Sequence, residues 1–329
     1  MKKSMLLKQM VKRPLSLAVI ATFATLCGAS PGWAVALLGD AQSFAVTGAA
    51  GVTNVPTDAT SVIGNLGVSP SASVTGFPAG TVSGGSIHLN DGPGPGTAIN
   101  AQAGVLNART ALAGLPGSTG LPVIALGLNT LGSGGTVNDL TPGVYTFSSS
   151  ASLLGTLTLD AGGAINPVFV FLIPTSLTVA SDSSVVVDPG GVNGGRDAGI
   201  FWVTGTAATL GEDSAFAGNI LAGSAITLDP GAQIACGRAL AQTAVTFAGV
   251  SSTPRNNLVD ALDCTGTAGE GSPIGSSGFS GGLEFTDAGQ LVLIGATPVA
   301  DTPEPATLAL LGIGLLGFAP RLRRRRSGR

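Results

Sequence analysis

The side chains best suited to acid–base chemistry in this sequence cluster in one stretch of the chain. They are Asp182, Asp188, Asp197, Glu212 and Asp213, with Arg196 as the neighbouring basic residue. Paired carboxylates are the catalytic groups of most glycoside hydrolases. These carboxylates, however, occupy turn-forming positions and have no lysine near them. We therefore interpret them as solvated turn residues and expect no enzyme activity; the alternative is a polysaccharide-degrading enzyme.

Cysteine and histidine are too few and too far apart for a metal site. Cys27 lies near the N-terminus, and the one histidine, His88, is distant in sequence from Cys236 and Cys264. Two cysteines in an exported protein predict one disulfide, which would add about 3 kcal/mol by closing a loop of this length. The alternative is two unpaired buried thiols. We expect neither a metal nor a cofactor.

A set of threonine-containing segments repeats along the chain. The segments are Thr175-Ser176-Leu177-Thr178-Val179, Thr206-Ala207-Ala208-Thr209-Leu210, Ser224-Ala225-Ile226-Thr227-Leu228 and Thr243-Ala244-Val245-Thr246-Phe247. Strand alternation would send their apolar side chains to one face. The opposite face would then carry one file of Ser176, Ala207, Ala225 and Ala244 and another of Thr178, Thr209, Thr227 and Thr246. Successive threonines of the second file are 31, 18 and 19 residues apart, which suits coils of three short strands, the first with an insertion.

These two files predict an uncharged surface of hydroxyl and methyl groups. Equivalent residues of stacked coils lie about 4.8 Å apart, and alternate residues of one strand about 6.7 Å apart. β-Branching restricts the threonine side chain, so little rotamer entropy is lost when the surface docks. Such a surface could hold an ordered water layer, whereas charged groups would keep their own hydration shells. The alternative is that the threonines only favour strand formation.

Turn signals in the same region support a coiled β-architecture. Leu159-Asp160-Ala161-Gly162, Val187-Asp188-Pro189-Gly190 and Leu228-Asp229-Pro230-Gly231 repeat one corner sequence. Proline followed by glycine suits a type II turn, in which glycine supplies the positive φ. Two repeats that keep the same register predict a parallel β-helix.

One segment departs from the strand pattern. Residues 97–113 predict a helix, with Thr97 as N-cap, Gly114 as C-cap and a modest apolar stripe of Ile99, Ala103 and Leu106. The β-helical body is expected to span residues 37–265. Residues 266–302 resemble a Gly/Ser-rich linker with a short apolar stretch that could form one hairpin.

Composition limits the classes of partner. Between residues 37 and 302 there are four basic and seventeen acidic residues, a net charge of −13. Nucleic acids and anionic membranes both require clustered lysine and arginine, so neither is an expected partner. Only 10% of all residues are charged and 51 are glycine, so small hydroxyl and aliphatic side chains must cover much of the surface.

The N-terminus indicates export. A basic stretch precedes an apolar run over residues 15–26, and Ala34-Val35-Ala36 forms an A-x-A site for signal peptidase. Residues 1–36 are therefore predicted to be a signal peptide. The alternative, an uncleaved anchor, is disfavoured because the run is shorter than the roughly 20 residues that span a bilayer.

The C-terminus carries a second sorting pattern. Pro303, Glu304 and Pro305 precede a short apolar helix over residues 306–320 and an arginine-rich tail. Over residues 303–329 the chain resembles the PEP-CTERM sorting signal of Gram-negative bacteria. The resemblance implies transient membrane insertion through this helix, processing by an exosortase, and delivery to the outer surface or extracellular matrix. The alternative is a plain tail anchor.

The body between the two signals resembles the DUF3494 family of bacterial and fungal ice-binding proteins. The resemblance rests on Leu38-Gly39-Asp40-Ala41-Gln42-Ser43-Phe44-Ala45-Val46, Gly64-Asn65-Leu66-Gly67-Val68-Ser69-Pro70, Thr75-Gly76-Phe77-Pro78-Ala79-Gly80, Ile87-His88-Leu89-Asn90-Asp91, Leu140-Thr141-Pro142-Gly143-Val144-Tyr145 and Gly237-Arg238-Ala239-Leu240-Ala241-Gln242-Thr243-Ala244-Val245-Thr246. It implies a right-handed β-helix of triangular section, mainly β, with a long helix packed alongside and the N-terminal strands docked beside the C-terminal ones. It also implies adsorption to ice through T-A-x-T-like steps.

Two functions therefore compete at the level of sequence. The first is an exported ice-binding protein whose candidate contact residues are the two files named above. The second is a matrix or adhesion protein on the same scaffold, without ice activity and with extracellular polysaccharide as a candidate partner.

Overall fold

The computed structural model describes residues 35–55, 60–116, 119–127, 129–135, 137–188, 190, 198–249, 255–262 and 277–294. The N-terminal unit, residues 1–32, lies outside these ranges, as does the whole sorting signal with Pro303, Glu304 and Pro305. Cys264, Arg196 and Asp197 also lie outside them. Within the described part of the chain, no helix is both long enough and apolar enough to cross a membrane.

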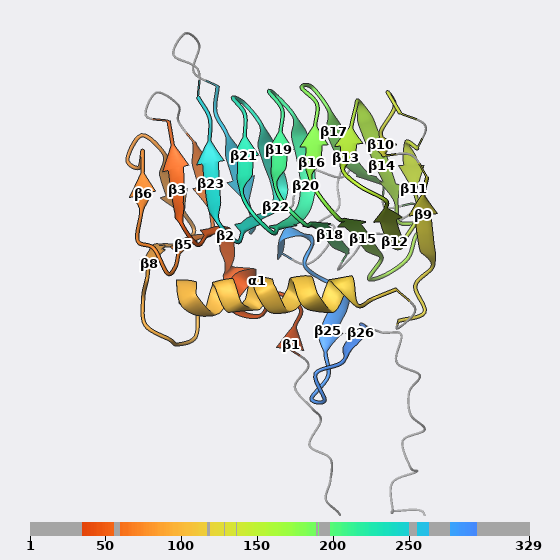
Figure 1. Ribbon diagram of the computed structural model, residues 1–329, viewed down its shortest axis with the longest axis horizontal. Coiled ribbons are helices and arrows are strands. Elements are labelled where there is room, and N and C mark those ends of the chain that lie inside the picture. Colours follow the sequence, from red (N-terminus) through yellow and green to blue (C-terminus); the bar gives the residue numbers. More distant parts are fainter. Residues whose placement is uncertain are drawn as a thin grey trace, which may run out of the picture. The chain divides into compact units, whose positions relative to one another are not determined.

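Parallel strands form a coiled β-solenoid, as the turn and strand repeats predict (Figure 1). We name its first face the threonine wall. In spatial order it contains β10 (Thr130–Leu131), β13 (Ala151–Leu153), β16 (Leu177–Val179), β19 (Ala208–Leu210), β21 (Ile226–Leu228), β23 (Ala244–Phe247), β3 (Gly51–Asn54) and β6 (Val74–Thr75). All neighbours in this sheet pair in parallel.

Two further walls complete each coil. The helix wall contains β9 (Val123–Leu126), β12 (Gly143–Phe147), β15 (Val168–Ile173), β18 (Gly199–Thr204), β20 (Ala215–Ala222), β22 (Gln233–Ala241), β2 (Phe44–Gly48), β5 (Asn65–Val68) and β8 (Ile87–Leu89). The third wall contains β11 (Asp139–Leu140), β14 (Thr156–Asp160), β17 (Ser184–Asp188), the first residues of β20 and β22, β24 (Leu258–Asp260), β4 (Ser61–Ile63) and β7 (Thr81–Ser83).

The long strands β20 and β22 bend from the third wall onto the helix wall. Gly218 and Gly237 lie in register at this bend, with φ of 105° and 147°. A Cβ atom at Gly237 would come within 2.0 Å of the Gly218 carbonyl oxygen. Glycine is needed there because no other residue fits both the positive φ and the close approach of the two strands.

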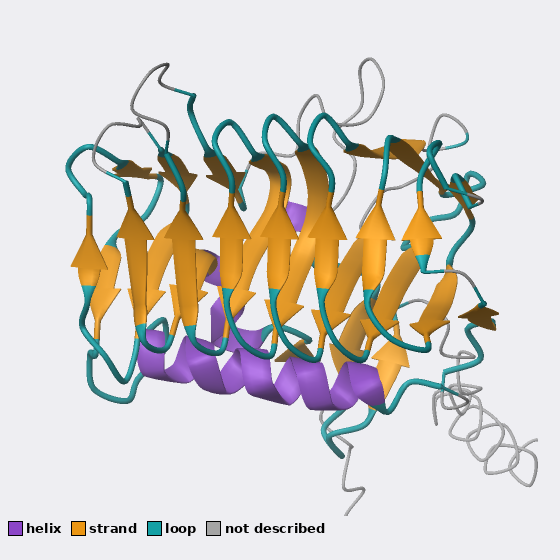
Figure 2. Cartoon of the chain, turned by 45° about the horizontal axis from the view of Figure 1, so that its top comes forward, coloured by secondary structure: helices purple, strands orange, loops and turns teal. Residues whose placement is uncertain are grey.

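The predicted helix is present and covers the helix wall. Helix α1 (Ala98–Ala113) begins at the N-cap Thr97, whose Oγ1 accepts a hydrogen bond from the Asn100 N–H, and ends at Gly114. It runs across the strands along the body (Figure 2), and sixteen residues at about 1.5 Å each span about 24 Å. The helix thereby returns the chain from the β8 end of the solenoid to the β9 end.

The predicted apolar stripe of α1 (Ile99, Ala103 and Leu106) is wrong, because it is not the buried face of the helix. Leu106 is 54% exposed, and Ala103 is exposed as well. The buried residues are instead Ala98, Ala101, Val105, Ala108 and Leu112. They repeat at intervals of three and four, and three alanines on this face allow the helix to lie close to the wall.

The C-terminal part of the described chain packs against the solenoid. β25 (Leu283–Phe285) and β26 (Leu291–Leu293) form an antiparallel hairpin, and β1 (Val35–Ala36) pairs with β25. The preceding turn η2 (Ser277–Phe279) buries Phe279 completely in the main core. This part of the predicted Gly/Ser-rich linker is therefore an ordered component of the fold. Because β1 ends at the predicted signal-peptidase site, cleavage there would remove this strand.

Candidate functional site

The structure brings the four predicted threonines together on one wall. Thr178 pairs with Thr209, Thr209 with Thr227, and Thr227 with Thr246, so all four lie in one file across β16, β19, β21 and β23. The residues on either side of each threonine point into the core; Leu177, Leu210 and Phe247 are completely buried. The predicted alternation is therefore confirmed for these strands.

The same file continues beyond the four predicted residues in both directions. Thr246 pairs with Thr53, and Thr53 with Thr75. At the other end Thr178 pairs with Ser152, and Ser152 with Thr130. Eight strands thus carry an uninterrupted hydroxyl file, which we name the threonine ladder and which consists, in spatial order, of Thr130, Ser152, Thr178, Thr209, Thr227, Thr246, Thr53 and Thr75.

Four members of the ladder were not predicted from sequence. Ser152 lies in Ala151-Ser152-Leu153 and Thr53 in Gly51-Val52-Thr53-Asn54, and both segments keep the alternation of the predicted repeats. That alternation was the available signal. It could not assign a wall by itself, because none of these four segments has the T-A-x-T-like step, with a hydroxyl residue first and a threonine last, that the predicted segments share.

Two further files run parallel to the ladder. The first file contains the predicted small residues, each two positions before a ladder threonine: Ser176, Ala207, Ala225 and Ala244. They lie in register because the strands that follow them pair in register, and Ala244 itself pairs with Gly51. At the base of the wall, backbone N–H groups of Thr206, Ser224 and Thr243 donate to the carbonyl oxygens of Thr175, Thr206 and Ser224, respectively. The first residue of each T-A-x-T-like step therefore also forms a file, so the wall has two rows of hydroxyls separated by a row of small side chains.

The ladder hydroxyls face solvent and are available to water. Thr53, Thr75 and Thr178 are exposed, and the other members are half-buried between their neighbours. Within the described ranges, Ser152 and Thr130 form the one side-chain hydrogen bond along the file, at 3.2 Å. Hydroxyls at the other six positions make no hydrogen bond to described residues, so each can donate to and accept from a water molecule.

Ionised side chains lie at the corners rather than on the strands of this wall. Glu212 and Asp213 are exposed and pair with Arg255 at 3.2 and 2.5 Å. Asp188 accepts a hydrogen bond from the backbone N–H of Gly190, at 2.9 Å. Asp182 has a φ of 57° in a turn. The structure therefore places Asp182, Glu212 and Asp213 in turns, as predicted, whereas Asp188 is the last residue of β17, directly before a turn. The described residues contain no group of three or more potential metal ligands.

Burial also affects the corner residue Asp229. Desolvation raises its pKa above the ordinary value of 3.8, and the nearby Glu212 carboxylate raises it further. Its backbone carbonyl closes the Asp229-Pro230-Gly231 turn by accepting from Ala232 N–H at 2.9 Å, with Gly231 at a φ of 78°. This agrees with the predicted glycine-dependent corner.

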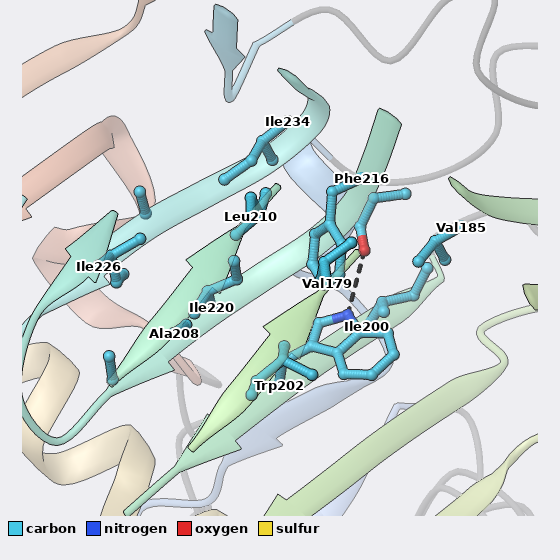
Figure 3. Packing of buried hydrophobic residues seen from close by; sticks show 14 of the residues in the cluster. Val179, Val185, Ile200, Trp202, Ala208, Leu210, Phe216, Ile220, Ile226 and Ile234 are labelled. Atoms are coloured by element: carbon cyan, nitrogen blue, oxygen red, sulfur yellow. Dashed lines mark hydrogen bonds between the residues drawn. The ribbon is translucent and has the colours of Figure 1, made fainter. Parts of the chain in front are cut away.

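A close-packed interior keeps the wall regular. Figure 3 shows Val179, Ala208, Leu210 and Ile226, which point inward from the threonine wall, facing residues of the other two walls. Trp202 stacks on Phe171 with ring centroids 3.7 Å apart, and its Nε1–H donates to the Ala217 carbonyl oxygen at 3.1 Å. Each strand of the wall therefore rests on side chains that cannot shift without opening a void.

A buried arginine joins segments that are distant in sequence. Arg238 is completely buried, and its guanidinium donates to the carbonyl oxygens of Gln42 and Gly278 and to Asn219 Oδ1. Desolvation lowers its pKa to about 9. Because Gln42 belongs to the N-terminal turn η1 (Gly39–Ser43) and Gly278 to η2, Arg238 helps to hold the N-terminal coils in place beside β22 and β23.

The disulfide prediction is supported at one of its two residues. Cys236 lies in β22, is completely buried and is disulfide-bonded. Its predicted partner, Cys264, lies outside the described residues, so the Cys236–Cys264 pairing stays a prediction.

Comparison with known proteins supports the interpretation of both parts of the chain. Residues 46–253 match the ice-binding-like family, and residues 301–326 match the PEP-CTERM protein-sorting motif. An ice-binding protein of Nostoc sp. (strain HG1) is 41% identical over 239 residues, which cover 72% of this chain and 80% of that protein. An ice-binding protein of Flavobacterium frigoris (strain PS1) is 30% identical over 64% of this chain and 73% of that protein.

Solved structures show the same relationship. The crystal structure of an ice-binding protein from the Antarctic ascomycete Antarctomyces psychrotrophicus has 34% sequence identity and a TM-score of 0.56, covering 68% of this chain and 97% of that one. The DUF3494 domain of Shewanella frigidimarina ice-binding protein 1 has a TM-score of 0.56 and 25% identity, covering 68% of this chain and 96% of that one. The protein is thus a member of the non-catalytic ice-binding-like family and carries a PEP-CTERM motif, which implies export and sorting to the cell surface.

Proposed function

We propose that this protein adsorbs to ice through the threonine wall. The observation that supports this most directly is the eight-strand ladder of Thr130, Ser152, Thr178, Thr209, Thr227, Thr246, Thr53 and Thr75. The relatives of this protein from Nostoc and Flavobacterium are ice-binding proteins, and the threonine wall offers a surface suited to binding ice.

The geometry of the wall favours contact with ordered water. Seven steps of about 4.8 Å give the ladder a length of about 34 Å. At seven of the eight positions threonine presents a hydroxyl and a methyl group with a restricted χ1, while the neighbouring file offers Ala207, Ala225 and Ala244. Water can therefore hydrogen-bond to the hydroxyls and lie over weakly hydrated methyl groups between them, an arrangement that a growing ice lattice can adopt with little reorganisation.

The other two walls are poorer candidates. α1 and the C-terminal hairpin cover the outer face of the helix wall, where Val170, Phe201 and Leu240 are buried beneath them. The third wall carries Asp160 and Asp188 in register on neighbouring strands, together with the exposed Val186. Ordered water would be disturbed there by carboxylate hydration shells.

The two terminal signals support a location for the protein outside the cytoplasm. After removal of the predicted signal peptide, an exosortase-type enzyme would process the PEP-CTERM tail following transient insertion of residues 306–320 into the membrane. The product would then lie at the outer surface or in the extracellular matrix of a Gram-negative cell. There it could attach the cell to ice or modify ice growth nearby, with extracellular polysaccharide as a further candidate partner.

The growth habit of a single ice crystal tests this proposal. The protein would be prepared as residues 37–294, because Phe279 and the hairpin belong to the packed body. Facets and a gap between the melting and freezing temperatures are expected. A round, freely growing crystal at millimolar protein would instead favour the second function, a matrix or adhesion protein without ice activity.

A further inference from the structure

A small pocket lies where α1 meets the junction of the helix wall and the threonine wall. Its volume is about 280 Å³, and it is lined by Arg109, Ala113, Leu172, Ile173, Pro174, Val203 and Gly205. Apart from the arginine, the side chains in this lining are aliphatic. The volume is near the lower end of the range for pockets that hold small molecules, so a ligand must be short.

Arg109 is a cation without a carboxylate partner in the described part of the chain. Its Nη1 donates to the carbonyl oxygens of Thr204 and Leu221 at 2.8 and 2.5 Å, and no ion pair to Arg109 occurs among the described residues. Desolvation lowers the pKa of its guanidinium. The contrast with Arg255, which pairs with two acidic side chains, shows that a counter-charge is supplied elsewhere but not here.

The guanidinium also retains unused donors. Its two hydrogen bonds to described residues both use Nη1, whereas five N–H groups are available on an arginine. Nη2 lies beside Gly223, where an added Cβ would come within 2.7 Å of it. That Cβ would also come within 2.2 Å of the Gly205 carbonyl oxygen, so the close approach of the two backbones requires glycine at residue 223. Nε and Nη2 of Arg109 make no hydrogen bond to described residues and are the donors that a ligand could use.

We propose that this pocket binds a short apolar monocarboxylate, with the carboxylate on Arg109 and the hydrocarbon part against Ala113, Leu172 and Val203. A carboxylate is favoured because arginine binds it through two parallel hydrogen bonds. An unbranched or branched aliphatic body is favoured over a sugar ring because the lining offers neither an aromatic platform nor a set of polar side chains. Residues 37–302 carry a net charge of −13, so anions are repelled from the protein in general and attachment depends on this one cation.

Calorimetric titration of the chain with hexanoate, at pH 7 and about 0.15 M salt to screen the long-range repulsion, tests the proposal. Saturable binding is expected, at least tenfold tighter than for hexan-1-ol or hexylamine. Arg109→Met is expected to weaken hexanoate binding at least tenfold. Because this change also removes two contacts that hold α1, a second variant that keeps the arginine is required.

Ala113→Phe serves as that second variant, since its ring would fill the pocket while Arg109 remains. Thr110→Phe is the matched control, because Thr110 lies on the same helix but lines a different groove beside the hairpin. Hexanoate binding should be lost in Ala113→Phe and retained in Thr110→Phe, with ice-crystal faceting unchanged in both. Equal affinity for hexanoate and hexan-1-ol, or undiminished binding by Ala113→Phe, would overturn the carboxylate site and leave the proposed ice contact unaffected.

Discussion

Replacement of a central threonine by tyrosine should damage ice adsorption far more than the same replacement at the end of the ladder. Thr227 is the fifth of eight positions, and Thr75 is the last. A tyrosine ring stands above the neighbouring side chains and separates the wall from a flat ice surface. Thr227→Tyr therefore leaves uninterrupted runs of four and three positions, whereas Thr75→Tyr leaves a run of seven.

The expected magnitudes follow from these runs. At about 4.8 Å per step, the longest run shrinks from about 34 Å to about 14 Å in Thr227→Tyr and to about 29 Å in Thr75→Tyr. If each position contributes equally, the first variant loses about half of the adsorption free energy and the second about one eighth. Because attachment depends exponentially on that free energy, Thr227→Tyr should lose nearly all of the freezing gap and Thr75→Tyr should keep most of it.

Nanolitre osmometry of the melting and freezing temperatures provides the assay, with Thr158→Tyr as the matched control. Thr158 is half-buried and lies between the buried Leu157 and Leu159 on β14, so it faces outward from the third wall. All three variants should show the same circular dichroism spectrum. The reasoning is refuted if Thr158→Tyr abolishes the freezing gap, or if Thr227→Tyr retains as much of it as Thr75→Tyr.

Three further predictions concern the scaffold. In Arg238→Met, the acceptors on Gln42, Asn219 and Gly278 lose a buried donor, so chemical denaturation should show that the free energy of unfolding falls by about 3 kcal/mol or more. The control Arg255→Met removes a surface ion pair and should lower it by less than about 1 kcal/mol. Equal losses in the two variants would contradict the buried network. Partial burial raises the pKa of Asp91, but hydrogen bonds from His88 and the Ala98 N–H outweigh this effect and hold the pKa below 3.8. Asp91→Asn should therefore be less thermally stable than the wild type at pH 7, and this difference in stability should shrink as the pH falls through the lowered pKa. A difference in stability that grows in acid would refute the lowered pKa. Trp202 is the one tryptophan between residues 37 and 294 and is completely buried, so fluorescence should be blue-shifted and resistant to iodide; ready quenching would show that the core stack is open.

Sequence reasoning was reliable wherever a structure is set by neighbouring residues. The inward side chains of β16, β19, β21 and β23 follow from alternation alone, because a strand has a period of two residues. Gly231 takes the positive φ that its corner sequence predicts. Thr97 and Gly114 end the helix as expected, since capping depends on groups within one turn.

The orientation of the helix and the role of the C-terminal segment required the tertiary structure. Large apolar side chains suggested that Ile99 and Leu106 face the core, but the wall is approached through Ala101 and Ala108, whose size matters only once a surface lies opposite. Gly278 belongs by composition to a flexible linker, yet its carbonyl accepts a hydrogen bond from the buried Arg238. Composition could not reveal that partner, 40 residues away.

The amino-acid sequence by itself determined the strand alternation, the corner turns, the helix limits and the uncharged character of the repeated steps, because each depends on contacts within a few residues. Only the tertiary structure decided that the ladder has eight positions. Thr53 lies beside Thr246 although 193 residues separate them, because α1 carries the chain back along the solenoid and the N-terminal coils extend the stack begun by the C-terminal ones. That adjacency arises from packing between distant segments, which no local pattern encodes.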